Sequence, residues 1–316
     1  MKQRPFQQVD VFTDTAFLGN PLAVVLDGTG LSDAQMQSFA AWTQLSETTF
    51  VLPPTEEGAK AGADYRVRIF TPAAELPFAG HPTLGTAHAW LSAGGQARHD
   101  GQLIQECGVG LVTLQKQGPY WSFAAPPLQR QQPAPALLAE VLAALGLHAN
   151  DVIAAQDLHN GPHWLGLLID SVDLLLALDP DHAALKRLNT KVGVAAKREH
   201  RPNALIRRAN REARAFATTA SSSASGSASN IAHDPTDLEV RAFAAPVGVT
   251  EDPVTGSLNA SLAQWLMAEG HLPTQYSARQ GTALGRAGEV FLSQDTNGQV
   301  WVGGHVVACI QGNVTL

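Results

Sequence analysis

Two segments of the chain place a glycine and a polar residue directly before a stretch of helical character. The first reads Gly80-His81-Pro82 and the second reads Thr255-Gly256-Ser257. The first N–H groups of a helix lack intrahelical partners, and together with the helix dipole they favour an anion. A small carboxylate-bearing molecule between two such loops would be held at both ends. A local role for the same residues, with Ser257 as a helix cap and His81 as a turn residue, is the alternative.

Two carboxylates lie close to predicted element boundaries. Glu47 stands between an apolar helix and an apolar strand, where desolvation would raise its pKa and suit it to general acid/base work. A surface glutamate at a helix end fits the same pattern. Asp252 stands five residues before Ser257 and is placed to orient a substrate amine or a histidine. An aspartate before Pro253 is equally typical of a turn in which the side chain bonds its own backbone.

The two glycine loops belong to a block that occurs once in each half of the chain. The copies begin Arg68-Ile69-Phe70 and Arg241-Ala242-Phe243, and each continues with a proline, a carboxylate before a second proline, and the glycine loop. A helix-like stretch then runs to Gly94 or Gly270. Glu75, taken as the first copy's counterpart of Asp252, is expected to be a buried structural carboxylate. Two related halves that each present a polar loop predict one small-molecule site between them.

The pattern of apolar residues predicts more strands than helices. Strands are expected at 9–12, 22–26, 48–52, 65–70, 103–114, 120–124, 163–170, 300–303 and 306–310. Helices are expected after Ser32, which forms a capping-box pattern with Gln35, and at 82–94 and 137–147. This balance favours an α+β protein with two similar domains over a doubly wound parallel sheet. The Pro-rich stretch 126–135 divides them into domains 1–125 and 126–316, and the C-terminal strand is free to return to the first.

Composition narrows the class of partner. The chain has 316 residues, 45% of them hydrophobic and 16% charged, with a formal net charge of −7. An acidic balance argues against nucleic acid as the main partner. We expect a cytoplasmic protein, because the N-terminus lacks a signal-peptide pattern and no apolar run is long enough to span a membrane. Neither metal-ligand spacing nor a nucleotide-binding motif is present, so no metal and no cofactor are expected. Cys107 and Cys309 are expected to be reduced thiols, mostly buried.

Two segments of the second half stand apart in composition. Ten of the 21 Lys and Arg residues lie within 186–214. A solvated face is favoured there over a basic docking surface. Residues 218–230 are nearly all Ser, Ala, Thr and Gly, which predicts a mobile surface loop.

Four motifs in order resemble those of the PhzF-like phenazine-biosynthesis family. They read FLGNPLAV at 17–24, SETTF at 46–50, ELPFAGHPT at 75–83 and EDPVTGS at 251–257, and Gln280-Gly281 agrees as well. The resemblance runs from about residue 8 to the C-terminus. It implies the diaminopimelate-epimerase-like fold, an α+β architecture of two pseudo-symmetric domains. Each domain is a β-barrel-like sheet wrapped around a central helix, with the active site in the cleft.

The resemblance also implies roles for single residues. The catalytic set would be Glu47, His81 and Asp252, with Glu47 as the acid/base that moves a proton between carbons of a dihydro-hydroxyanthranilate. In epimerases of this fold, two cysteines at the paired helix starts exchange protons with the substrate. Cys107 and Cys309 lie outside those places, so a two-thiol racemase is not expected.

The leading hypothesis is therefore a cofactor-independent isomerase acting on a small carboxylate-bearing metabolite. The substrate-binding residues would be Asn20, Gly80, Gly256 and Ser257. An amino-acid-type epimerase or racemase, with Glu47 opposed by His81 or Asp252, and a non-catalytic binding protein of the same fold are the alternatives. The resemblance also suggests a homodimer. The motifs indicate a class of reaction more than a particular substrate.

Overall fold

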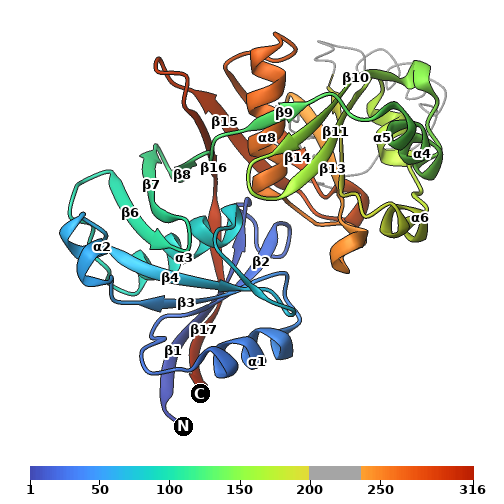
Figure 1. The fold of residues 1–316 in the computed structure, drawn as a ribbon. Coiled ribbons are helices and arrows are strands. Elements are labelled where there is room, and N and C mark those ends of the chain that lie inside the picture. Colours follow the sequence, from blue (N-terminus) through green and yellow to red (C-terminus); the bar gives the residue numbers. More distant parts are fainter. Residues whose placement is uncertain (199–235) are drawn as a thin grey trace, which may run out of the picture.

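The computed structural model describes residues 1–198 and 236–316. The predicted Ser-rich loop at 218–230, and the basic segment beyond Arg198, lie outside the described residues. Figure 1 shows two lobes, with both chain termini at the free end of the first lobe. There the backbone N–H of Lys2 donates to the carbonyl of Leu316 at 2.6 Å.

The first half of the chain alternates short strands with three helices. Its elements are β1 (Gln3–Val11), β2 (Asn20–Val25), α1 (Asp33–Thr43), β3 (Thr48–Leu52), α2 (Glu56–Lys60), β4 (Tyr65–Phe70), β5 (Glu75–Leu76), α3 (Gly80–Ser92), β6 (Gln102–Cys107), β7 (Gly110–Gln117) and β8 (Tyr120–Ala124).

The second half repeats this arrangement with extra helices. Its elements are β9 (Gln129–Gln131), α4 (Pro135–Leu145), η1 (Ala149–Asp151), β10 (Val152–His159), β11 (His163–Ile169), α5 (Val172–Ala177), α6 (His182–Arg187), β12 (Val192–Lys197), β13 (Leu238–Phe243), η2 (Ala245–Val247), α8 (Gly256–Ala268), β14 (Gln275–Gln280), η3 (Thr282–Leu284), β15 (Gly288–Gln294), β16 (Val300–Gly304) and β17 (Val306–Thr315).

Strand pairing shows that the two halves have the same topology. In the first, β1 and β2 form an antiparallel pair, β3 lies parallel to β2, β4 antiparallel to β3, and β6 parallel to β4. In the second, β10, β11, β12, β13 and β14 pair in the same order and the same directions. The first strand of each set has one more antiparallel neighbour, β17 beside β1 and β9 beside β10. The C-terminal strand thus extends the sheet of the first half.

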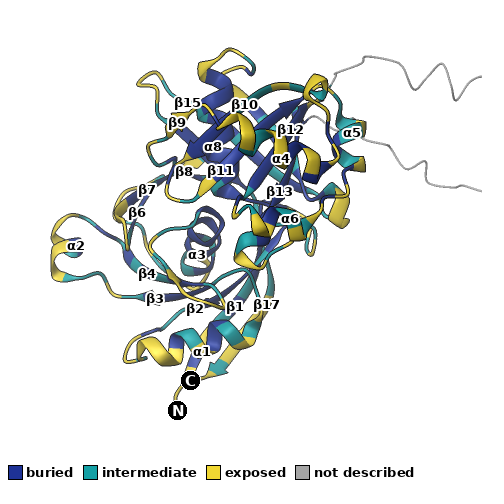
Figure 2. Ribbon diagram, turned by 45° about the vertical axis from the view of Figure 1, so that its right-hand side comes forward, coloured by how far each residue is buried: buried dark blue, intermediate teal, exposed yellow. Residues whose placement is uncertain are grey.

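Each sheet wraps around one central helix, α3 in the first half and α8 in the second. Both helices have 13 residues and are buried along most of their length, as Figure 2 shows. The largest apolar cluster runs through both halves, from Val9 to Val302. The halves are also joined by antiparallel pairing of β8 with β16. This is the epimerase-like fold that the motifs implied.

Several predicted elements differ in detail from those observed. The expected strand at 103–114 is a hairpin of β6 and β7, because Cys107 pairs with Gly110 and the chain reverses between them. Apolar residues occur on both sides of the turn, and only Gly108 and Gly110 mark it in the sequence. The Pro-rich stretch 126–135 contains β9, whose pairing with β10 joins it to the second half.

Each half of the chain contains the same arginine–glutamate ion pair, so the duplication extends to individual side-chain contacts. Arg68 donates from Nε and Nη2 to the Glu75 carboxylate at 2.7 and 2.6 Å, and its guanidinium lies 5.1 Å from the Phe70 ring centroid. Arg241 makes the matching bidentate contact with Glu251, at 3.0 and 2.7 Å, and lies over Phe243 at 4.9 Å.

Two expectations about these carboxylates were therefore wrong. The counterpart of Glu75 is Glu251 and not Asp252, because Glu251 occupies the equivalent bidentate contact. Glu75 is also exposed, with 42% of its side chain accessible, since its strand β5 lies at the surface.

Candidate active site

The N-termini of the two central helices meet at the boundary between the halves. A Cβ atom built on Gly80 would lie 3.2 Å from the Cα of Gly256 and 2.6 Å from Cζ of Phe123. Only a residue without a side chain allows this approach. Neither helix start is capped by a side chain. Amide groups that lack intrahelical partners are thus concentrated at one place, which favours negative charge there.

Glu47 and His81 lie together beside the start of α3. Glu47 comes directly before β3, after α1 has ended, and His81 is the second residue of α3. Glu47 Oε2 and His81 Nε2 are 3.3 Å apart, with side-chain exposures of 15% and 6%. Both atoms lack a hydrogen-bond partner within the described part of the chain. The contact is therefore close but not aligned as a hydrogen bond.

Burial sets the protonation of this pair. Desolvation, with a smaller contribution from the charge of Asp252, raises the pKa of Glu47 to about 8. Desolvation lowers the pKa of His81 to about 3, against the opposing effect of a backbone hydrogen bond at Pro21. A neutral carboxyl group and a neutral imidazole therefore face each other near neutral pH. Such a carboxyl group can both release and accept a proton there.

Asp252 is held by residues from both halves. The Asn20 side-chain amide donates to Asp252 Oδ1 at 3.0 Å and to the carbonyl of Val254 at 2.9 Å. The Thr255 hydroxyl donates to Asp252 Oδ2 at 2.6 Å. Desolvation raises the pKa of Asp252 to about 6, although both hydrogen bonds and the charge of Lys191 lower it. Both amide hydrogens of Asn20 are thus used by protein atoms.

A buried amide network supports the loop that carries Asp252. Gln280 Nε2 donates to the carbonyl of Asp252 at 2.9 Å and to Thr255 Oγ1 at 3.0 Å. Gln280 Oε1 accepts from the backbone N–H of Thr255 and from Asn259 Nδ2 at 3.1 and 2.8 Å. The loop geometry is therefore set by side chains that follow it in the sequence. Gln280 lay in an agreeing motif, but nothing in the sequence pointed to Asn259.

Ser257 occupies the place in α8 that His81 occupies in α3. Its hydroxyl lies 3.4 Å from Trp164 Nε1, and its carbonyl accepts from Asn160 Nδ2 at 3.0 Å. Ser257 is the second residue of α8, and Thr255 holds the N-cap position, so Ser257 is not the helix cap. Trp164 and Asn160 carried no signal in the sequence, because their proximity to Ser257 arises from strand pairing around the helix.

Every residue of the predicted site thus falls in one region. Glu47 and His81 form its first-half side, Asp252 and Ser257 its second-half side, and Gly80 contacts Gly256 between them. Cys107 and Cys309 lie elsewhere, at the end of β6 and within β17. Both are free and half-buried rather than mostly buried.

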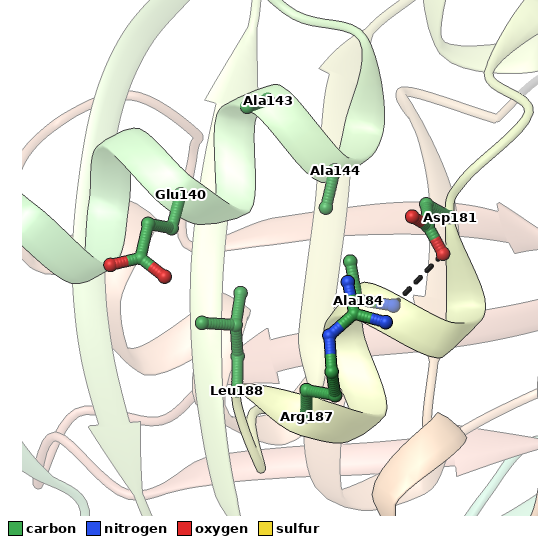
Figure 3. A pocket seen from close by; sticks show the side chains of 7 residues that line it. All are labelled: Glu140, Ala143, Ala144, Asp181, Ala184, Arg187 and Leu188. Carbon is green, nitrogen blue, oxygen red and sulfur yellow. Dashed lines mark hydrogen bonds between the residues drawn. The ribbon is translucent and has the colours of Figure 1, made fainter.

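A surface hollow in the second half is a separate feature. It measures about 520 Å³ between α4 and α6 (Figure 3) and is lined by Glu140, Ala143, Ala144, Asp181, Ala184, Arg187 and Leu188. Asp181 is already used there, since its carboxylate caps α6 by accepting from the Ala184 amide at 2.8 Å. Within residues 1–198 and 236–316, no group of three acidic, His or Cys side chains is arranged to hold a metal. In the same ranges no helix has the length and apolar character needed to cross a membrane.

Comparison with known proteins identifies the family to which the chain belongs. The family model for phenazine biosynthesis-like proteins (PhzC-PhzF) matches residues 9–312. Antisense-enhancing sequence 1 of Schizosaccharomyces pombe is 33% identical over 329 residues, covering 99% of each chain. The trans-2,3-dihydro-3-hydroxyanthranilate isomerase of Pseudomonas aeruginosa is 32% identical over 322 residues, covering 98% of each chain.

A solved structure shows the same fold. The crystal structure of the PhzF-family phenazine biosynthesis protein of Bacillus anthracis superposes with a TM-score of 0.78 at 21% identity, covering 100% of both chains. The fold, the match over nearly the whole length and the full-length relatives lead to one assignment. The chain is an isomerase and belongs to the phenazine biosynthesis-like (PhzC-PhzF) family.

Proposed function

We propose that the protein moves a proton between carbons of a small cyclic carboxylate, with Glu47 as the general acid/base. The observation that carries this proposal is the buried Glu47 carboxyl group, whose pKa lies near 8 and which faces a neutral His81 at 3.3 Å. A carboxyl group with a pKa close to the working pH is suited to taking a proton from one carbon and returning it to another. The full-length relative from Pseudomonas aeruginosa, named for a dihydro-hydroxyanthranilate, supplies the first compound to test.

The surrounding groups have complementary tasks in this reaction. Removing a proton from carbon places negative charge on the substrate, and the amides at Gly80 and Gly256 stabilise such charge without reorganising. His81 and Asp252 orient the substrate, and Asn20 and Thr255 hold the Asp252 carboxylate in place. Ser257 binds a polar group of the substrate on the side of α8.

Solvent deuterium incorporation tests the proposal directly. The protein is incubated in D₂O with trans-2,3-dihydro-3-hydroxyanthranilate, and the products are analysed by mass spectrometry and NMR. We expect wild type to introduce deuterium at one ring carbon with migration of a double bond. Glu47→Gln should abolish incorporation while the fold and ligand binding persist, because the amide cannot exchange a proton with carbon.

The control is Glu57→Gln, which removes an exposed carboxylate from α2 and should leave incorporation unchanged. Undiminished incorporation by Glu47→Gln would remove Glu47 from the mechanism. Inversion at one carbon without double-bond migration would instead indicate an epimerase. Tight binding with no incorporation in wild type would indicate a binding protein.

A further inference from the structure

The duplication places Lys191 where the first half has Glu47. Each residue comes directly before the third strand of its half, β3 or β12. The register is the same, since Thr48 and Val192 each pair with the phenylalanine of the Arg-x-Phe motif in the next strand. Lys191 is therefore the pseudo-symmetric partner of Glu47, although their charges are opposite.

The Lys191 side chain lies on the face of the sheet that covers α8. Gly193 is two residues further along, and a Cβ atom there would lie 2.3 Å from the Leu258 side chain in the first turn of α8. Residues two apart on a strand share a face. Lys191 also lies beside Trp164 of β11, with Nζ 4.8 Å from the ring centroid. Since Trp164 Nε1 lies 3.4 Å from Ser257 Oγ, the ammonium group lies next to the start of α8.

The Lys191 side-chain nitrogen is only partly engaged by other groups of the protein. Among residues 1–198 and 236–316, no carboxylate lies within ion-pair distance of Lys191 Nζ, and its contact is with the face of Trp164. The charge of Lys191 lowers the pKa of Asp252, and the charge of Asp252 in turn raises the pKa of Glu47. Burial lowers the pKa of Lys191, and the charge of Asp252 opposes that shift. A partly desolvated cation beside uncapped helix amides attracts an anion more strongly than an exposed lysine does.

We propose that Lys191 binds the carboxylate of the substrate at the start of α8, on the side of the site opposite Glu47. The inference deepens the proposed function and rests on it. The carboxylate would then sit against the Lys191 ammonium and the Ser257 end of the helix. The carbon that exchanges its proton would lie toward Glu47. Of the two pseudo-symmetric positions, one would then hold the acid/base Glu47, and the other would hold Lys191, which binds the negative charge of the substrate.

Ligand affinity tests this role without turnover. The probes are 3-hydroxyanthranilate and its neutral carboxamide, titrated by calorimetry into wild type, Lys191→Met and Lys197→Met. Methionine keeps an unbranched apolar side chain up to the ε position and removes the ammonium group. Lys197 is an exposed lysine at the far end of the same strand. We expect Lys191→Met to weaken carboxylate binding by about 10- to 100-fold, the usual range for a charge-assisted hydrogen bond. Affinity for the carboxamide should not change, and Lys197→Met should bind both probes as wild type does.

The outcomes separate this inference from the proposed function. Equal loss of carboxylate and carboxamide binding in Lys191→Met would overturn it, as would unchanged carboxylate binding or no carboxylate binding by wild type at millimolar concentration. Unfolding temperatures are measured for each variant, and Lys191→Gln replaces Lys191→Met if the latter does not fold. If deuterium incorporation depends on Glu47 but Lys191→Met does not change carboxylate affinity, the isomerase proposal holds and the role of Lys191 is refuted. If Lys191→Met selectively loses carboxylate affinity but no deuterium is incorporated by wild type, the anion site holds and the isomerase proposal is refuted.

Discussion

At the scale of single residues, the protonation of Glu47 depends on burial more than on its neighbours. Desolvation is the largest cause of its raised pKa, and the charge of Asp252 adds to it. The same carboxyl group in a solvated turn would be ionised at neutral pH. Its Oε2 atom is unpartnered in the described part of the chain. The burial of this carboxyl group therefore lowers folding stability.

The raised pKa of Glu47 predicts how the free energy of unfolding depends on pH. The pKa of Glu47 is about 8 in the folded protein against an ordinary value of 4.5. Between these values the folded protein retains a proton that the unfolded chain has released, so the group costs stability as the pH rises through that window. Glu47→Gln removes the cost. The variant should gain on the order of 2 kcal/mol over wild type near pH 7 and much less near pH 5.

Urea unfolding of both proteins from pH 5 to pH 8.5 measures this difference. Glu57→Gln serves as the control for loss of a carboxylate at an exposed position. A stability difference between Glu47→Gln and wild type that stays constant across this range would show that Glu47 does not titrate as its burial indicates.

At the scale of elements, the two Arg-x-Phe strands carry the same ion pair in different surroundings. In the second half, Arg241 and Glu251 each have only 7% of their side chains exposed. Arg241 also donates to the carbonyls of Leu175 and Leu178, at 3.1 and 2.7 Å, which ties α5 to β13. The pair thus holds the crossover helix against the strand that leads to the active-site loop.

The duplication supplies a matched pair of substitutions. Glu251→Gln leaves a buried guanidinium without its counter-charge, and should cost about 3 kcal/mol of unfolding free energy. Glu75→Gln removes the equivalent carboxylate at the surface, where the cost should stay below about 1 kcal/mol. Denaturant unfolding of both variants checks the contrast. Equal losses would mean that burial does not distinguish the two pairs.

At the scale of the whole molecule, the C-terminal strands complete the first half. β17 pairs with β1 from Gln3 to Val11, and β16 pairs with β8. Both edges of the first sheet are therefore covered by the last strands of the chain. An uncovered strand edge exposes unpaired backbone groups and promotes association between molecules.

Truncation after Gly304 tests this dependence. We expect the shortened chain to lose its cooperative thermal transition or to aggregate, because β1 loses one of its two neighbouring strands along its whole length. A synthetic peptide of residues 305–316, added in excess, should restore part of the transition measured by circular dichroism. Unfolding of the truncated chain at the wild-type temperature would show that β17 is dispensable.

Much of the site follows from local sequence. The repeated block predicted two related halves, and the glycine loops predicted two helix starts. The motifs marked Glu47, His81, Asp252 and Ser257, which the structure brings into one region. Strands with clear alternation, such as 65–70, were predicted correctly because alternation reflects one buried face. The hairpin at 103–114 was missed because apolar residues occur on both sides of the turn, which only Gly108 and Gly110 mark.

Other features depend on contacts between residues distant in the chain, which only the tertiary structure decides. Strand pairing placed Trp164 and Lys191 at the start of α8. The bidentate contact with Arg241 made Glu251 rather than Asp252 the counterpart of Glu75. The raised pKa of Glu47 needs the surrounding sheet and helix to exclude water, and no stretch of sequence encodes that exclusion locally. The sequence by itself determined which groups the site has and that it has two sides. The tertiary structure decided which groups face each other, because desolvation and distance arise only when both halves pack together.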